Sequence, residues 1–229
     1  MRTSGLLFAV SAAASLIFLL ARPLSVGDWP VIFKVLSILL LAVLGFRVDG
    51  LLGSALALSS LGDFLLGVRR IGNLDEESLF LLGLGTFLIA HLIYIGLFRK
   101  FLILVWWKPG PARVWGVLAI LVGLASVLGI LRHSLGSMFI PVVVYSLVLS
   151  GMGIGAMLAD LGTPLAAFGA LLFIASDAMI AIAKFRGPFP GNGQLIWITY
   201  YAAQVLILRG VDDSKKPGGY KYVGKSERH

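Results

Sequence analysis

The chain has 229 residues, of which 59% are hydrophobic and only 13% are charged, and its mean hydropathy is +0.97. A soluble globular protein carries charged residues at about a quarter of its positions, so this composition excludes a soluble domain and indicates an integral membrane protein. The net charge of +8 does not indicate nucleic-acid binding, because the basic residues lie in loops and near the C-terminus and form no stripe with aromatic residues. The absence of cysteine excludes a disulfide, a thiolate nucleophile and a cysteine-based metal site.

Eight apolar segments follow one another along the chain, most of them close to the length of about 20 residues that crosses a bilayer as a helix. They are apolar on all sides, and backbone inside lipid must form its hydrogen bonds internally, so we expect helices and not strands. The sequence therefore predicts an all-α polytopic membrane protein, with one helical bundle over residues 1–210 and a basic polar tail over residues 211–229. The expected spans are 5–21, 29–45, 50–67, 78–98, 113–131, 137–158, 164–184 and 194–209.

The first span has a basic start and an apolar core, as a signal peptide has, but no small-residue cleavage site precedes a polar mature start. We therefore expect a retained helix. With eight spans both termini lie on one side, which collects twelve Lys and Arg residues against six on the other. The positive-inside rule then predicts cytoplasmic termini, in the endoplasmic reticulum of a eukaryotic cell or the inner membrane of a bacterium.

Strongly polar side chains within the spans are costly in lipid, so each of them requires an explanation. We expect five of them to lie in the half of the bilayer away from the termini, at depths that agree within about two helical turns, and to share a cavity. These five are Lys34, Asp63, Tyr145, Asp177 and Tyr200. His91 and Tyr94 share one helix face and lie deeper.

Each of these residues also has a purely structural explanation. Lys34 could form an ion pair with Asp63, and Asp177 could pair with Lys184 two turns further along its own helix. The convergence of two carboxylates, one ammonium group and several phenols at one depth favours a functional site. Other polar residues could hold helices together by hydrogen bonds, namely His91, Tyr94, Tyr200, Tyr201 and Gln204.

Several hydrolytic chemistries are disfavoured by the residues present. A zinc hydrolase needs three or more histidine or carboxylate ligands, and of the three histidines only His91 lies within a span. A serine hydrolase of the GxSxG type is disfavoured because that motif does not occur. Two carboxylates without a metal suit acid–base chemistry on a substrate that forms an oxocarbenium ion.

The polar residues occur within a characteristic series of segments. After Lys34 the series reads LGDFLLG, GTFLIAHLIYIGLF, IPVVVYSLVLS, GALLFIASDAMIAIAKF and TYYAAQVLI. In order and spacing this series resembles the YhhN-like lysoplasmalogenase family of multi-spanning membrane proteins, from about Lys34 to Ile207. The lysine–proline pair usual in that family is Lys34–Val35 here, which keeps the amine.

The resemblance implies an activity that the residues can support. Family members cleave the vinyl ether of alkenyl lysophospholipids to a fatty aldehyde and glycerophosphoethanolamine or glycerophosphocholine, and we expect no metal and no cofactor. Vinyl ethers hydrolyse by protonation at carbon, so the reaction needs a carboxylic acid that is still protonated near neutral pH and a negative group that stabilises the cation. We predict Asp63 and Asp177 as this catalytic pair, with Asp177 the better acid if Lys34 pairs with Asp63. The expected substrate-binding residues are Lys34, His91, Tyr94, Tyr145, Tyr200 and Gln204.

Two other functions use the same polar lining. A lysolipid-binding or transport protein would bind the lipid in membranes without releasing aldehyde. An amide-cleaving lipid hydrolase of the ceramidase type would need zinc, and the shortage of histidine argues against it.

Overall fold

The computed structural model of the chain describes residues 2–24, 27–102 and 110–216, so most of the basic tail, residues 217–229, lies outside the described residues. The described residues form eight α-helices and two short 3-10 turns, which confirms the predicted all-α class. The helices are α1 (Arg2–Ala21), α2 (Val31–Val48), α3 (Gly50–Gly67), α4 (Glu76–Arg99), α5 (Pro111–Leu131), α6 (Phe139–Leu158), α7 (Leu165–Phe185) and α8 (Asn192–Ser214).

Capping residues set where several helices begin. Asp49 is the single residue between α2 and α3, and its Oδ1 accepts a hydrogen bond from the backbone nitrogen of Leu51 at 2.9 Å. Asp75 caps α4 in the same way, through the backbone nitrogen of Ser78 at 2.9 Å. α5 begins at Pro111, whose fixed φ suits the first turn of a helix. The connection through Asp49 places α2 and α3 side by side and antiparallel, and α3 also packs against α4.

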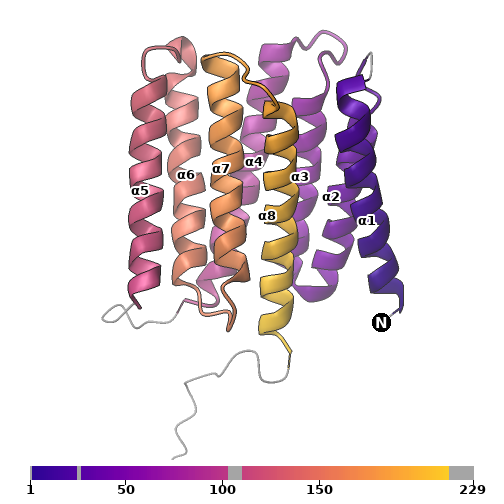
Figure 1. The fold of residues 1–229 in the computed structure, drawn as a ribbon, viewed down its shortest axis with the longest axis vertical. Helices are drawn as coiled ribbons and strands as arrows, with labels where there is room; N and C mark the ends of the chain where they lie inside the picture. The colour runs from indigo at the N-terminus through magenta and orange to yellow at the C-terminus, as the bar shows by residue number, and fades with distance from the viewer. Residues whose placement is uncertain (1, 25–26, 103–109, 217–229) are drawn as a thin grey trace, which may run out of the picture.

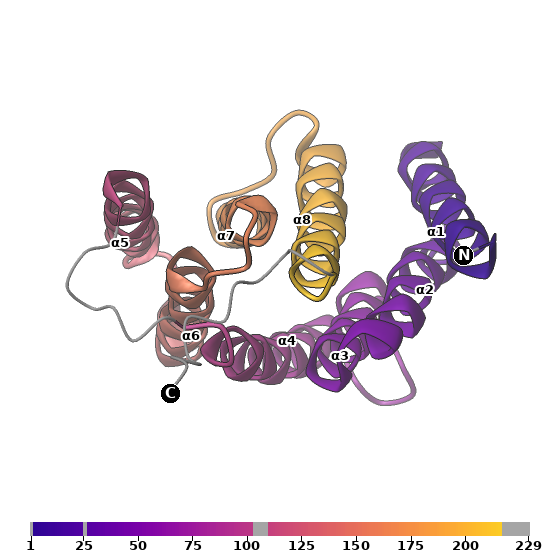
Figure 2. The ribbon, with the colours of Figure 1, turned by 90° about the horizontal axis from the view of Figure 1, so that it is seen from below.

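The helices form two layers (Figure 2). α1, α2, α3, α4 and α6 make a curved row, α7 and α8 pack on its concave side, and α5 stands at one end against α6 and α7. α7 and α8 approach each other closely, because a Cβ atom on Gly169 would lie 2.8 Å from the carbonyl oxygen of Ala203. A Cβ atom on Gly210 would lie 2.7 Å from the nitrogen of Ala166, so these two positions admit only glycine without a shift of the helices.

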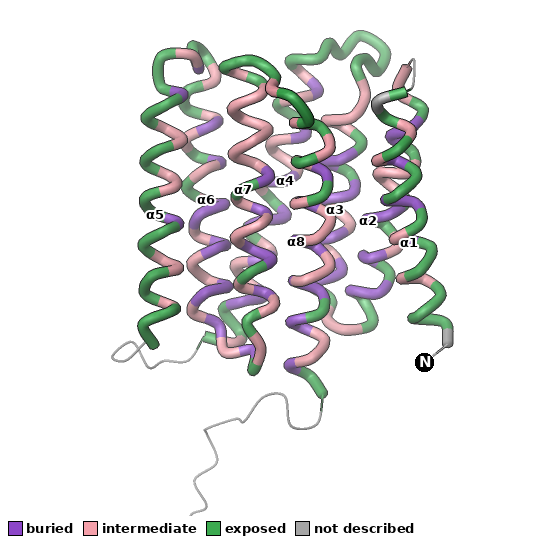
Figure 3. The backbone as a smooth tube through the Cα atoms, viewed as in Figure 1, coloured by how far each residue is buried: buried purple, intermediate pink, exposed green. Residues whose placement is uncertain are grey.

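Seven of the eight helices in the described part of the chain, α1 to α7, are long and apolar enough to cross a membrane. α8 does not reach that hydropathy because it carries polar residues such as Tyr200 and Gln204, which are buried inside the bundle. Its 23 residues nevertheless extend about 34 Å alongside the other helices (Figure 1). Large apolar side chains are exposed on the outside, where α1 and α5 present mostly exposed residues (Figure 3). The chain is therefore a multi-pass integral membrane protein, as predicted.

The start of α1 and the end of α8 lie at one face of the bundle (Figure 1), which we name the terminal face; the opposite one is the distal face. At the terminal face Asp49 binds Lys100 Nζ at 3.0 Å and Lys215 Nζ at 2.8 Å. Burial by itself would raise the pKa of Asp49, but the hydrogen bonds from both lysines outweigh it and lower the pKa to about 2. Asp49 thus joins the α2–α3 turn to the ends of α4 and α8 as a carboxylate.

Candidate active site

Asp63 on α3 has both carboxylate oxygens engaged. Oδ1 lies 3.0 Å from Lys34 Nζ of α2, and Oδ2 accepts the hydroxyl hydrogen of Tyr200 of α8 at 2.7 Å. Asp63 is only 1% exposed, and Lys34 Nζ also lies 5.8 Å from the ring centre of Trp197. The ion pair considered from the sequence is therefore present, and it joins three helices.

A directed chain of hydrogen bonds continues from this carboxylate towards the terminal face. Gln204 Nε2 donates to the Tyr200 oxygen at 3.3 Å, and Gln204 Oε1 accepts the hydroxyl hydrogen of Tyr94 at 2.6 Å. Asp63, Tyr94, Tyr200 and Gln204 are buried, and each donor of the chain points towards Asp63; the side chain of Lys34 is 18% exposed. We name this set the Asp63 group; it comprises Lys34, Asp63, Tyr94, Tyr200 and Gln204.

Asp177 on α7 has a different environment. The hydroxyl of Tyr145 on α6 donates to Oδ2, whereas Oδ1 has no hydrogen-bond partner among the described residues. Lys184, the alternative partner considered from the sequence, instead pairs with Glu76 at 3.0 Å. The neighbouring Ser176 points elsewhere, since its hydroxyl donates to the carbonyl oxygen of Ile196 on α8. Asp177 and Tyr145 together form the Asp177 group.

A cavity of about 260 Å³ lies between α4, α5, α6 and α7, and Asp177 is the only charged residue among the described residues that line it. Most of the wall is apolar, with Tyr145, Ser146 and Ser150 as its other polar members. The cavity reaches the outside of the bundle at Ala175, which is exposed. Asp177 can therefore meet an apolar molecule that arrives from the side of the bundle.

Aromatic rings connect the two groups. The ring of Phe173 lies 5.3 Å from that of Tyr200 and 4.8 Å from that of His91, and His91 lies 5.4 Å from Tyr145, between ring centres. His91 is fully buried and neither ring nitrogen has a hydrogen-bond partner among the described residues, so its predicted role with the substrate stays a prediction. Among those residues no group of three or more His, Asp or Glu side chains could hold a metal ion.

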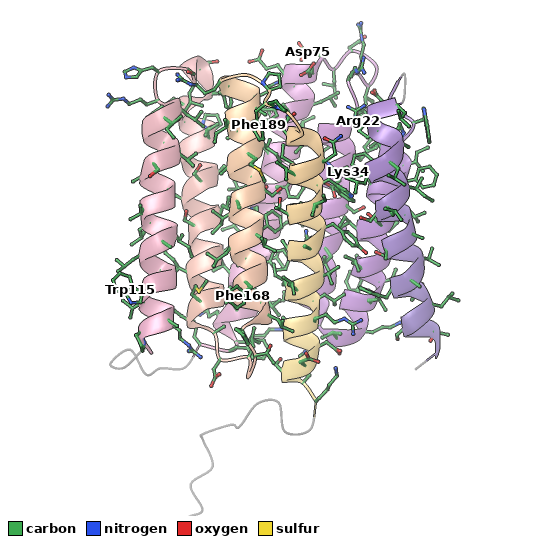
Figure 4. The ribbon with its side chains drawn as sticks, in the orientation of Figure 1. Arg22, Lys34, Asp75, Trp115, Phe168 and Phe189 are labelled. Carbon is green, nitrogen blue, oxygen red and sulfur yellow. The ribbon has the colours of Figure 1, made fainter. Side chains whose placement is uncertain are left out.

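The structure thus brings the predicted residues into one region, but of these only Tyr145 and Asp177 line the cavity, whereas the Asp63 group lies outside its wall. Figure 4 shows Lys34 in the half of the bundle nearer the distal face, on the same side as Arg22. Phe87 and Phe173, whose ring centres lie 6.2 Å apart between the groups, were not predicted, because a phenylalanine in a membrane span does not stand out from the other apolar residues. Tyr201, considered from the sequence as a residue that holds helices together, hydrogen-bonds with the hydroxyl of Ser11 at 2.9 Å and so joins α8 to α1.

Residues 29–211 match the model of the YhhN family. The chain belongs to the YhhN family. The match begins just before α2 and ends within α8, so every predicted site residue lies inside it, whereas α1 lies outside.

This YhhN-family chain is similar to several proteins that are named lysoplasmalogenase. A protein of Mycobacterium bovis named Lysoplasmalogenase is 40% identical over 165 residues, which cover 68% of this chain and 58% of that protein. Lysoplasmalogenase TMEM86A of Bos taurus is 36% identical over 152 residues, covering 62% and 60%. Lysoplasmalogenase TMEM86B of Mus musculus is 32% identical over 203 residues, covering 86% and 81%. The chain thus spans less than two thirds of the mycobacterial and bovine relatives, and no solved structure matches it.

Proposed function

We propose that the protein is a lysoplasmalogenase, which hydrolyses the vinyl ether of alkenyl lysophospholipids within a membrane. The names of its relatives support this activity. The observation that carries the proposal is the position of Asp177: one of its oxygens is unpaired among the described residues, and it lines an apolar cavity that opens on the side of the bundle. An alkenyl chain fits such a wall, and a carboxylic acid is the group that vinyl ether hydrolysis needs.

The proposed reaction begins with Asp177 protonated. Its proton goes to the carbon of the double bond farther from the ether oxygen, and the electrons of that double bond form the new C–H bond. The remaining cation is an oxocarbenium ion, to which one water molecule adds while the Asp177 carboxylate takes up the proton that the water releases. The hemiacetal then separates into a fatty aldehyde and glycerophosphoethanolamine or glycerophosphocholine, with Asp177 restored.

Asp63 takes the complementary role in this proposal. Lys34 and Tyr200 occupy both of its oxygens, so it remains an anion and does not reach the substrate. Its negative charge would act on the cation across the rings of Phe173 and His91, which lie between Tyr200 and Tyr145. Tyr94 and Gln204 hold Tyr200 in the orientation in which it donates to Asp63, and Tyr145 positions Asp177.

The proposal is tested by locating, in the aldehyde product, the hydrogen that the acid transfers. Purified protein in vesicles is given 1-alkenyl-glycerophosphoethanolamine in deuterated water, and the aldehyde is trapped at once as a hydrazone. We expect one deuterium on the carbon next to the carbonyl carbon, because the acid delivers its proton to carbon. The saturated 1-alkyl ether should give no product. Aldehyde without deuterium would contradict the mechanism, and lipid binding without any aldehyde would indicate a lysolipid-binding or transport protein instead.

We also infer that the terminal face is cytoplasmic, because the sequence has twelve Lys and Arg residues in the termini and the connections between spans expected on that side, against six on the other. The chain has no cysteine, so single cysteines report the side of the membrane directly. An impermeant thiol reagent on intact cells should label Asn73→Cys at the distal face and leave Gly50→Cys at the terminal face unlabelled. The reverse pattern would place the active site in the cytoplasmic half of the bilayer.

A further inference from the structure

The cavity beside Asp177 ends near the distal face at two aromatic rings. Phe80 of α4 and Phe185 of α7 both line it, and they meet edge to face with ring centres 6.1 Å apart. Lys184 Nζ lies 5.1 Å from the ring centre of Phe80 and donates a hydrogen bond to Glu76 Oε1 at 3.0 Å. One cation, one anion and one aromatic face therefore meet at this end of the cavity, which we name the cavity mouth.

The charges at the cavity mouth are accessible, unlike those of the Asp63 group. The side chain of Lys184 is 34% exposed and that of Glu76 is 71% exposed. An exposed ion pair of this kind contributes little to stability, so a ligand that offers each member a better partner can separate the two at low cost. By contrast, the polar atoms of Tyr94, Tyr200 and Gln204 are buried, bonded to one another, and absent from the cavity wall.

The spacing between the mouth and Asp177 suits a lysolipid. Lys184 follows Asp177 by seven residues, which is two turns on one face of α7 and about 10 Å along the helix axis. A glycerol unit with its phosphodiester covers a comparable distance, so a vinyl ether at Asp177 places the phosphate near Lys184. On the other side of Asp177 the cavity continues to Leu171, which also lines a second cavity of about 430 Å³ towards the terminal face. We expect the alkenyl chain to extend in that direction.

We propose that Lys184, Glu76 and Phe80 bind the zwitterionic headgroup of the lysolipid. The phosphate binds the Lys184 ammonium group, and the ethanolamine or choline cation binds the Glu76 carboxylate and the face of Phe80. The position of the vinyl ether rests on the proposed function, whereas the headgroup site rests on the cavity mouth itself. The substrate then lies along α7 with its headgroup at the distal face.

Two substrates separate headgroup binding from catalysis: 1-alkenyl-glycerophosphoethanolamine, and 1-alkenylglycerol, which has neither phosphate nor amine. We expect Lys184→Gln to raise KM and lower kcat/KM about tenfold on the phospholipid, since a charge-assisted hydrogen bond is lost, and to leave 1-alkenylglycerol unchanged. We expect the Glu76→Gln variant to show equal kcat/KM for substrates with a phosphoethanolamine headgroup and with a plain phosphate headgroup. Arg186→Gln is the matched control, because it removes a cation at the same end of α7 from a residue that donates to Ser134, whereas Lys184 lies over Phe80 of the cavity wall.

Equal effects of Lys184→Gln on both substrates, or no effect on either, would overturn the headgroup site. An effect of Arg186→Gln as large as that of Lys184→Gln would do the same, since general surface charge would then explain the result. Binding of the saturated 1-alkyl-glycerophosphoethanolamine is measured in parallel. If the protein releases no aldehyde but Lys184→Gln still weakens binding of this analogue, the proposed function fails and the headgroup site stands.

Discussion

Asp63 and Asp177 are the same kind of residue in the same bundle, and each accepts a hydrogen bond from a tyrosine, but the rest of their surroundings differs. Asp63 has an ammonium group on one oxygen and a phenol on the other, and it is closed off from the cavity. Asp177 has one phenol, one oxygen without a partner among the described residues, and an apolar cavity beside it. A fully bonded carboxylate serves as a fixed charge, whereas a partly bonded one can exchange a proton with a ligand. The environment, and not the residue type, divides the two roles.

The largest expected effect is on catalysis at Asp177. Asp177→Asn keeps the shape of the side chain and can still accept the hydrogen bond of Tyr145, but it has no acidic proton. We expect kcat for aldehyde release to fall about 10³-fold while the thermal unfolding temperature in detergent stays the same. Wild-type-like turnover in the folded variant would show that another group supplies the proton.

The next effect is on stability at Asp63. Asp63→Leu leaves the Lys34 ammonium group without its partner, and we expect a loss of about 3–5 kcal/mol in the free energy of unfolding. Lys34→Met combined with Asp63→Leu removes both charges and should recover most of that stability without recovering activity. Thermal unfolding and aldehyde release measured on both variants check this. A double variant as unstable as the single one would mean that the ion pair is not what Asp63 contributes.

A third test concerns the cavity, which Asp177 lines and Asp63 does not. Gly123 and Gly129 both lie on α5 with no atom within 4 Å of an added Cβ, but only Gly123 lines the cavity. We expect Gly123→Leu to lower kcat/KM for a long-chain substrate about tenfold, because it displaces roughly two methylene groups of the alkenyl chain. Gly129→Leu, the matched control, should keep wild-type kinetics, and both variants should fold as well as the parent chain. Equal losses in the two variants would indicate that α5 itself, and not the cavity, limits the rate.

The smallest effects separate the two phenols. Tyr200→Phe removes a donor from buried Asp63, so we expect it to cost about 1 kcal/mol of stability with little change in kcat. Tyr145→Phe should do the opposite, lowering kcat severalfold with little change in stability, because Asp177 loses its positioning bond at an accessible site. Thermal unfolding and kcat measured side by side decide between these patterns. Identical behaviour of the two variants would remove the distinction between the groups.

Much of this arrangement follows from the sequence, because charges inside lipid need partners. Lys34 and Asp63 are costly enough in apolar segments that their pairing could be predicted. The pairing of Lys184 with Glu76 could not, since both lie near helix ends where water can satisfy them. The sequence predicted a cavity shared by five polar residues, but of these only Tyr145 and Asp177 line it. Its apolar wall, which includes Gly123 and Ala175, could not be predicted, because an apolar residue at a cavity has the same hydropathy as one that faces lipid. In α8, buried polar residues have the opposite effect on prediction. They lower its hydropathy below that of a membrane span, although the helix packs alongside the other helices.

Ala175 is exposed on the membrane-spanning helix α7, so the cavity reaches the outside of the bundle there at a position that faces hydrocarbon. A lysolipid that approaches there diffuses in two dimensions, so turnover should follow its mole fraction among the lipids. Diluting the vesicles in buffer should leave the rate per vesicle unchanged, whereas adding inert phospholipid should lower it. The two products then part into different phases: the aldehyde dissolves in the bilayer and the glycerophosphoethanolamine in water, and this separation draws hydrolysis forward.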